Sequence, residues 1–549
     1  MYNVERGSKV YCCFLDSTKA FDTVWLDGLF YKLFNLGLRG KSWRILRGWY
    51  NRMKCSVSLG GLSSSLFSVK QGVRQGGVLS PWLFLCYNND LPVILMSTGY
   101  GLSIHDIPCS TILIADDITL LSVRVKGLQC LLDSVEKYSN KWRFQFNPSK
   151  SRIVTFGEST QQFNIKSKTR DWYLNGVAVE QTPAWEHVGI LLSGNFSSSD
   201  RSKSAVRKGR GVVGALMAAG ARAGGLNPIC AANLWRVFGL TAMLYGCQLW
   251  SNLCASERDF LNGVTNFSAK RFQGLPLTCH SEGALGSLEL WTTMAYIDMA
   301  KLLFFGNLCR SSPSLLHKEV FVKRLCSYLG GELSDHMGFV PDAIELLMKY
   351  HLYDCLDHYL EGGVFPNKRV WRNLVVEKVH ELEKHCWRWR MSFKPNLVHL
   401  MPTNHKLESL FHWTVAKESP FNRMALANLV NLMCGSVPSL LISAMEKTEN
   451  YYRCKLCKRT SGDVGHHFIM DCSVMNDERN ELWEFLNDNL HVLQLRNLFN
   501  LNDEDMYDCI ISGKIPGTRL NHETSCQFIL SVANTIWNIY KKVNMYMTA

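Results

Sequence analysis

The feature that most restricts the fold of this chain is a pair of adjacent acids inside an otherwise apolar segment. Residues 111–122 read TILIADDITLLS, with apolar runs on both sides of Asp116 and Asp117. Two such runs joined by so few residues predict a tight β-hairpin with the acids at its tip. Adjacent carboxylates repel unless a cation compensates for their charge. Aspartate also favours turns, so the pair taken alone indicates a plain turn more readily than a metal site.

A third carboxylate stands at the end of another predicted strand. Residues 10–16 read VYCCFLD, an apolar run that ends in Asp16. Magnesium prefers carboxylate oxygens together with substrate phosphates. Two such ions, about 3.5–4 Å apart, can hold the attacking and leaving oxygens of a phosphoryl displacement. We therefore expect Asp16 to lie close enough to Asp116 and Asp117 for joint coordination of cations.

The surrounding pattern predicts a mixed domain followed by a helical one. Glycine, proline and apolar spacing predict the following elements: helices over about 27–36, 41–53 and 128–140, a helix after Ser80-Pro81, a hairpin over 55–70, a strand over 153–156 and a hairpin at Asn175-Gly176. Residues 193–200, SGNFSSSD, indicate a linker. Nearly everything beyond them has a helical pattern, including an apolar segment at 234–250 that suits one buried helix.

The composition indicates the kind of partner and the kind of compartment. The 549 residues carry a formal net charge of +13, which favours polyanionic partners such as nucleic acid. The start of the chain is polar and resembles no secretory signal, so the 20 cysteines suit a reducing compartment. We expect an intracellular protein of the nucleus or cytoplasm, not secreted and without a membrane partner.

Five segments in order resemble the motifs of non-LTR retrotransposon (LINE-type) reverse transcriptases. They are FLDSTKAFDTV at 14–24, GVRQGGVLSPWLF at 72–84, IADD at 114–117, NPSKSRIVTF at 147–156 and AWEHVGILL at 184–192. One such match is weak, whereas five collinear matches are specific. The resemblance is close over roughly 1–290. It implies an α+β fold in which a right-hand polymerase palm, an antiparallel sheet with helices, precedes a helical thumb and an α-rich C-terminal region.

The resemblance also implies roles for individual residues. Asp16, Asp116 and Asp117 would hold two Mg²⁺ or Mn²⁺ ions, and Lys150 would assist the leaving pyrophosphate. Phe21 would crowd a ribose 2′-hydroxyl and so favour a dNTP. Gln75 and Gly76 would face the incoming nucleotide, and Arg74 would touch template phosphate. The reaction implied is RNA-directed DNA synthesis on an RNA template from a DNA primer. Alternatives are a core phenylalanine for Phe21 and surface roles for Lys150 and Arg74.

Two departures from the family pattern stand out. Ile114 occupies a position where the family usually has an aromatic residue, and only about fifteen residues precede Asp16. The second departure predicts an N-terminally truncated chain with partial fingers. The rival function is therefore a catalytically inactive, truncated remnant that only binds nucleic acid. A viral RNA-directed RNA polymerase is a further rival, against which Phe21 argues.

Basic residues mark two places in the helical half. Lys203, Arg207 and Arg210 fall at i, i+4 and i+7, on one face of a predicted helix. They suit contact with primer–template phosphates, or simply a solvated face. Residues 387–390 read WRWR, which suits either base stacking or the surface of a helix bundle.

A Cys/His cluster predicts a structural zinc site near the C-terminus. Cys454 and Cys457 have C-x₂-C spacing, and His467 and Cys472 complete a C-x₂-C-x₉-H-x₄-C set. His466 is the alternative third ligand, and a chance cluster is the alternative to a site.

The domain layout that follows has five parts. We expect a reverse transcriptase palm with partial fingers at 1–192, a helical thumb at 193–290, an α-helical linker region at 291–450, a CCHC zinc knuckle at 451–475 and a helical tail at 476–549. The sequence leaves the oligomeric state open.

Overall fold

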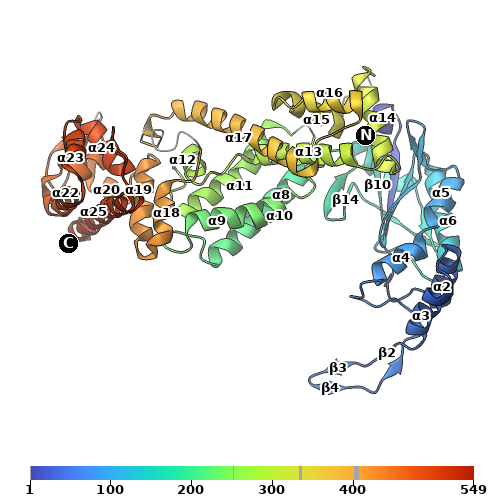
Figure 1. Cartoon of the computed structure of the whole chain (residues 1–549). Helices are drawn as coiled ribbons and strands as arrows, with labels where there is room; N and C mark the ends of the chain where they lie inside the picture. The colour runs from blue at the N-terminus through green and yellow to red at the C-terminus, as the bar shows by residue number, and fades with distance from the viewer. Residues whose placement is uncertain are drawn as a thin grey trace. The chain divides into compact units, whose positions relative to one another are not determined.

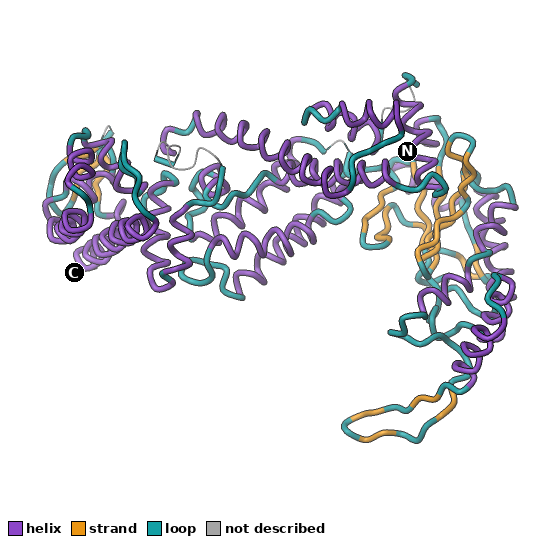
Figure 2. Tube along the Cα trace, viewed as in Figure 1, coloured by secondary structure: helices purple, strands orange, loops and turns teal. Residues whose placement is uncertain are grey.

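The structure of the chain is a computed structural model that describes residues 2–251, 253–332, 337–397, 399–400, 407–449 and 451–548. The chain divides into two compact units, one of Met1–Arg201 with Ser311–Asp342 and one of Ser202–Arg310 with Ala343–Ala549. Most strands belong to the first unit, and the second is almost entirely helical (Figure 2). The predicted α+β class is therefore confirmed.

A five-stranded sheet is the centre of the first unit (Figure 1). Its order is β13 (Glu180–Gln181), β10 (Arg152–Phe156), β1 (Val10–Leu15), β9 (Asp117–Ser122), β8 (Thr111–Ile114). The central strand β1 is antiparallel to both of its neighbours, β9 and β10. The strands expected from the apolar runs at the two acid-bearing segments therefore lie side by side.

Strand β1 is buried on both faces, which explains its continuous apolar run. Tyr11, Cys13 and Leu15 point into a core shared with the helices of this unit. Cys12 and Phe14 point to the other face, where Val154 and side chains of a small hairpin cover them. Successive side chains of a strand alternate between faces, so a strand covered on both sides needs apolar residues at every position.

Short elements complete the first unit. Its helices are α1 (Tyr2–Glu5), α2 (Leu26–Asn35), α3 (Gly40–Asn51), α4 (Ser80–Asn88), α5 (Leu91–Ser97), α6 (Val125–Lys141), α7 (Thr160–Lys166) and α14 (Leu316–Leu329). Its two-stranded ribbons pair β2 (Lys54–Cys55) with β5 (Phe67–Ser68), β3 (Ser58–Leu59) with β4 (Leu62–Ser63), β6 (Leu102–Ile104) with β7 (Ile107–Cys109), β11 (Tyr173–Leu174) with β12 (Val177–Ala178) and β14 (Ala184–His187) with β15 (Ile190–Ser193). Pro81 lies in the first turn of α4, where its missing N–H costs nothing.

The second unit is a helical assembly around a large apolar core. Its longer helices are α8 (Ser199–Ala218), α9 (Pro228–Leu234), α11 (Ala255–Gln273), α12 (Ser281–Gly286), α13 (Thr293–Arg310), α15 (Phe339–Lys349), α16 (Asp354–Gly362), α17 (Lys368–Ser392), α18 (Phe411–Glu418), α19 (Arg423–Met433), α20 (Ser439–Ser443), α22 (Asn476–Asn489), α23 (Val492–Phe499), α24 (Asp503–Ser512) and α25 (His522–Thr548). Three buried tryptophans, Trp371, Trp387 and Trp413, donate their indole N–H groups to other helices or loops; that of Trp413 donates to Gln273 Oε1 at 3.0 Å. Among the described residues, no helix has the length and hydropathy that a membrane span requires.

The prediction of a buried helix over residues 234–250 is confirmed for its first part only, because the helical backbone ends at Met243. Helix α9 ends at Leu234, a π-helical turn covers Trp235–Gly239, and α10 covers Leu240–Met243. The buried ring of Trp235 lies against Gly239, where an added Cβ would come within 1.9 Å of the ring. The chain then turns at Gly246, which has a left-handed φ of 75° that favours glycine.

Candidate active site and metal-ligand clusters

The sheet register brings the three predicted carboxylates to one end of the sheet. Leu15 pairs with Ile118, so the next residues along the antiparallel ladder, Asp16 and Asp117, face each other beyond the last pair. Asp116 lies in the turn between β8 and β9, whose last pair is Ile114 with Asp117. The hydroxyl of Ser17 donates to the carbonyl of Asp116 at 3.4 Å, which ties this turn to the segment after β1.

The charges at this edge influence one another. Burial raises the pKa of Asp117, and the charges of Asp116 and Asp16 raise it further, while His187 acts in the opposite direction. The oxygens of the three carboxylates do not all come within 4.8 Å of one another, since among the described residues only two other groups meet that spacing. The three acids therefore share one electrostatic environment without forming a closed ligand set.

The position of Asp16 is fixed by the segment that precedes β10. The backbone N–H of Asn147 donates to Asp16 O at 2.8 Å, and Asp16 N–H donates to Ser151 Oγ at 3.2 Å. Lys150 belongs to the same turn and is exposed. The first and fourth sequence motifs, more than a hundred residues apart, are thus directly bonded.

His187 is a residue at this edge that sequence reasoning missed. It ends β14, its Nε2 lies 3.1 Å from Thr119 Oγ1 on β9, and its ring lies 4.7 Å from that of Phe14. Burial lowers the pKa of His187, although the nearby Asp117 opposes that effect. The only local signal was its place in the motif-like segment AWEHVGILL at 184–192, which does not reveal a partner in another strand.

The predicted nucleotide-side residues lie where two loops meet. Val73 N–H donates to Phe21 O at 2.8 Å, and Gln75 Nε2 donates to Asp22 Oδ1 at 3.1 Å. Gly72 has a φ of 90°, and a Cβ there would lie 2.9 Å from the carbonyl oxygen of Asp22, so only glycine permits this approach. The loops therefore hold the two motifs together through the backbone.

A cleft opens beside this junction. Its volume is about 960 Å³, and Asp22, Arg74 and Gln75 line it together with residues of α3 and β2. Arg74, Gln75 and Gly76 are exposed, and nothing lies within 4 Å of a Cβ built on Gly76. The half-buried ring of Phe21 stacks on Phe84 with centroids 5.1 Å apart and planes 12° apart. The structure brings this second group of predicted residues together as well.

The predicted basic residues lie on one long helix. Lys203, Arg207 and Arg210 are all exposed on α8. Gly209 faces the core, where a Cβ would lie 2.8 Å from Met243 Sδ. That close approach explains why the helix contains a glycine despite its cost in a helix interior. Of the WRWR segment, Trp387 is buried, and Trp389 is exposed with its ring 4.9 Å from that of Phe393.

The Cys/His cluster assembles in the second unit. Cys454 ends β17 (Tyr452–Cys454) of a small sheet with β16 (Met445–Lys447) and β18 (Thr460–Ser461). The ligand atoms of Cys454, Cys457, His467 and Cys472 all lie within 4.8 Å of one another, and three of these residues are buried. Cys457 Sγ lies 3.3 Å from His467 Nε2. The hydrogen bond with Cys472 lowers the pKa of the Cys454 thiol, which favours a thiolate there.

The neighbouring histidine, His466, turns away from these four ligands. Its Nδ1 lies 3.2 Å from Asp471 Oδ2, and its ring centroid lies 5.1 Å from that of Tyr507. Beside the cluster, the buried Arg479 donates through Nη2 to Cys472 O at 2.7 Å and so places a positive charge near the thiols. His467 alone of the two histidines can join the three cysteines in this arrangement.

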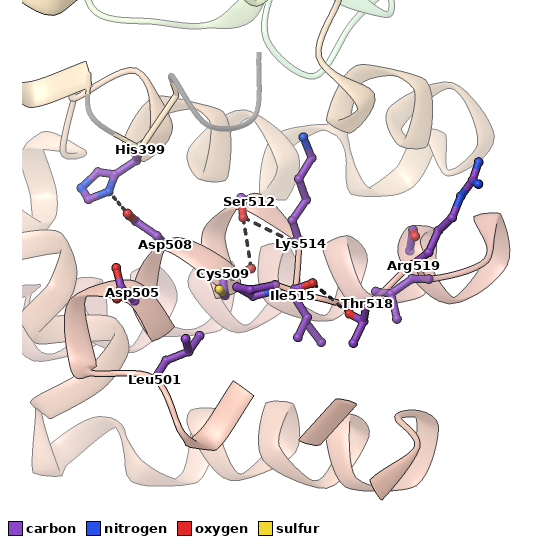
Figure 3. A pocket seen from close by; sticks show the side chains of 14 residues that line it. His399, Leu501, Asp505, Asp508, Cys509, Ser512, Lys514, Ile515, Thr518 and Arg519 are labelled. Carbon is purple, nitrogen blue, oxygen red and sulfur yellow. Dashed lines mark hydrogen bonds and ion pairs between the residues drawn. The ribbon is translucent and has the colours of Figure 1, made fainter. Parts of the chain in front are cut away.

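A separate cavity of about 660 Å³ lies in the C-terminal region (Figure 3). Leu501 and Ile515 contribute apolar surface, and His399 Nδ1 is bonded to Asp508 on its border. The side chains of Lys514 and Arg519 extend toward the same side in Figure 3. Burial lowers the pKa of Lys514. No sequence signal marked these residues, because they come from three different segments.

The first unit thus combines three acids at one end of a largely antiparallel sheet with a cleft at the junction of two bonded loops, and comparison with known proteins shows what it resembles. Residues 2–187 match the family model described as "Reverse transcriptase (RNA-dependent DNA polymerase)". This match, and the relatives below, agree with the resemblance to non-LTR retrotransposon reverse transcriptases seen in the sequence.

The similar proteins are polymerases of mobile elements. The chain is 26% identical over 269 residues to the RNA-directed DNA polymerase from mobile element jockey of Drosophila melanogaster, covering 48% of this chain and 28% of the relative. It is 31% identical over 195 residues to the jockey polymerase of Drosophila funebris, covering 34% and 20%. It is 27% identical over 193 residues to a Pol polyprotein from retrotransposable element R2 of Nasonia vitripennis, covering 34% and 18%. The chain thus spans less than a third of the length of each of these relatives.

Proposed function

We propose that this chain is an RNA-directed DNA polymerase of a non-LTR retrotransposon, which extends a DNA primer on an RNA template from dNTPs. The observation that carries the proposal is the register that sets Asp16 opposite Asp117 with Asp116 in the adjoining turn. The reverse transcriptase family match over residues 2–187 supports it. Under this proposal residues 1–192, which make up most of the first unit, are the palm with partial fingers.

The acids suit two divalent ions of the magnesium kind. They offer oxygen ligands only. Burial is the main cause of the raised pKa of Asp117, and the like charges of Asp116 and Asp16, which a cation would relieve, raise it further. Asp16 and Asp116 would hold both ions and Asp117 would be a weaker ligand. When bound, such ions stabilise the charge that develops as the primer 3′-hydroxyl attacks the α-phosphate of the dNTP. The bonds of Asn147 and Ser151 to the backbone of Asp16 fix its carboxylate in position.

The loop junction would hold the nucleotide. Gln75 and Gly76 would face the incoming dNTP, because the absence of a side chain at Gly76 leaves room for close approach. Arg74 would contact phosphate, and Lys150 would stabilise the departing pyrophosphate. The Phe21 ring, held flat against Phe84, would occupy the space that a ribose 2′-hydroxyl needs. The chain would thereby select deoxynucleotides by shape.

The second unit would hold nucleic acid and a structural metal. Residues 193–290 would be a helical thumb, in which Lys203, Arg207 and Arg210 of α8 contact primer–template phosphates. Residues 291–450 would be a helical linker region and 476–549 a helical tail. The knuckle at 451–475 would bind Zn²⁺ through Cys454, Cys457, His467 and Cys472, because three sulfurs and one imidazole nitrogen are the usual ligands of a closed zinc site.

Primer extension tests the polymerase proposal. The full chain would be incubated with a DNA primer annealed to RNA, with Mg²⁺ or Mn²⁺, and with dNTPs or NTPs in parallel. We expect extension with dNTPs and none with the Asp116→Asn variant. Binding of the duplex without extension under all these conditions would overturn the proposal in favour of a remnant that only binds nucleic acid. Extension with NTPs as efficient as with dNTPs would favour an RNA polymerase instead.

A further inference from the structure

A second group of possible metal ligands lies where α18 meets the beginning of α25. Glu418 is the last residue of α18, His522 is the first residue of α25, and Cys526 follows one helical turn later. Their ligand atoms all lie within 4.8 Å of one another. We propose that Glu418, His522 and Cys526 form a second metal site, which takes a transition-metal ion of the zinc class.

The three side chains already face one another. Cys526 Sγ lies 3.5 Å from Glu418 Oε2 and 3.7 Å from His522 Nδ1. His522 Nε2 lies 3.8 Å from Glu418 Oε1. Residues four apart share one face of a helix, so the helical geometry of α25 alone brings the imidazole and the thiol together. The third ligand comes from a residue 104 positions earlier in the sequence than His522, through the packing of α18 on α25.

The chemistry of the set selects the kind of ion. A thiol and an imidazole disfavour magnesium and calcium, which prefer oxygen ligands, and favour zinc and similar ions. Three protein ligands leave a fourth tetrahedral position for water or another small ligand. The side chain of Cys526 is buried, whereas His522 and Glu418 are exposed, so an ion held by the sulfur would be reached from the solvent side. Burial raises the pKa of this thiol to about 11, so an ion must displace a proton to bind.

The site would fix the beginning of a helix that also reaches the first Cys/His cluster. Ile539 and Val543 of α25 pack in the core that contains Cys454 and Cys472. From His522 to Val543 the helix extends roughly 30 Å at about 1.5 Å per residue. At its beginning, Phe411 of α18 packs edge-on against the His522 ring, with centroids 5.5 Å apart. One helix would therefore connect two metal sites of different kinds, one closed and one with an open position.

Metal stoichiometry of the full chain tests this proposal. The chain would be loaded with Zn²⁺, separated from free ion on a desalting column and analysed for bound metal. We expect the Cys526→Ser variant to hold one zinc fewer per chain than the wild type. The matched control is Cys509→Ser, since Cys509 is also a buried helix cysteine whose thiol pKa burial raises to about 11. Equal zinc content in the wild type and Cys526→Ser would overturn the proposal.

Cobalt titration provides a second readout, in which the two sites differ in their number of sulfur ligands. Co²⁺ bound by thiolates absorbs in the near ultraviolet in proportion to the number of sulfur ligands. With four thiolates in the wild type, Cys526→Ser should lose about a quarter of that absorbance, and Glu418→Gln should retain it while binding the second ion roughly tenfold more weakly. A second step that saturates only at millimolar Co²⁺, or one that Glu418→Gln leaves unchanged, would also overturn the proposal.

Discussion

The carboxylate edge of the first unit and the Cys/His cluster of the second differ in how completely the protein alone assembles them. The four ligand atoms of the Cys/His cluster already lie within 4.8 Å of one another. The three carboxylates share an electrostatic environment but do not converge to that spacing. Thiols can be neutral and hydrogen-bonded when close, whereas carboxylates at neutral pH repel one another. The ligand atoms of a structural site can therefore come together before an ion binds. The carboxylates of a site for two ions and a phosphate chain must stay further apart until the ions bind.

The largest effect that would test this contrast comes from removing one charge at the carboxylate edge, the open site of Asp16, Asp116 and Asp117. Asp16→Asn should lower the rate of primer extension by about 10³-fold or more, because several kcal/mol of transition-state stabilisation depend on the ions it would hold. Its melting temperature should change little, since Asp16 is bonded mainly through its backbone. Asp22→Asn, six residues later and exposed, is the matched control and should retain activity within about tenfold. Equal losses in both variants would mean that neither acid has a special role.

Removal of a ligand from the Cys/His cluster should affect folding more than catalysis. His467→Asn should remove one zinc per chain and lower the melting temperature of the second unit by roughly 5–10 °C, because a structural metal contributes directly to folding. Extension of a primer by a single nucleotide should fall by less than about tenfold. His466→Asn is the matched control, since it changes the adjacent histidine, which lies outside the ligand set. Metal analysis that finds the same zinc content in both variants would contradict the assignment of His467.

A smaller effect is expected at the loop junction. Phe21→Val should leave the carboxylates intact but raise the efficiency of NTP use relative to dNTP by about 10–100-fold, because the smaller side chain leaves room for a 2′-hydroxyl. Phe84→Leu is the control for lost stacking, since the two rings pack with centroids 5.1 Å apart. The ratio of kcat/KM for the two nucleotides measures the effect. If Phe84→Leu changed this ratio as much as Phe21→Val, the role of Phe21 would be packing alone.

The two regions also differ in how far the sequence predicts them. The strand leading to Asp16 and the hairpin bearing Asp116 were predictable from local apolar runs. The antiparallel pairing of β1 with β9, seen in the structure, brings the two acids to the same end of the sheet. The Cys/His cluster was predictable from spacing, because its four ligands lie within a stretch of 19 residues, 454–472. In both cases a short stretch of sequence contains most of the geometry.

Contacts between distant segments were not predictable in this way. Nothing near His187 indicates that it reaches Thr119, and nothing near Glu418 indicates that it meets Cys526. The buried Lys32, which bonds Asp90 Oδ1 and the Tyr138 hydroxyl at 2.6 Å each, has no sequence signature either. The π-helical turn at residues 235–239 places the ring of Trp235 against Gly239, which no local pattern indicates. Each of these features depends on tertiary packing, which periodicity and composition do not encode.

The smallest expected effect is a pH dependence that only the open site should show. The folded-state pKa of Asp117 is raised above the ordinary value of 3.8, mainly by burial. An acid of this kind contributes stability below its unfolded pKa and loses that contribution as pH rises through its folded pKa. Asp117→Asn should therefore melt about 1–3 °C higher than the wild type at pH 7, and this difference should shrink or disappear as the pH falls toward 4.

The measurement needs zinc but no magnesium, because magnesium would compensate for the charge. Asp171→Asn, at an exposed position, is the control and should show no such trend. A constant difference across this pH range would show that the carboxylate at residue 117 carries no electrostatic cost in the folded protein.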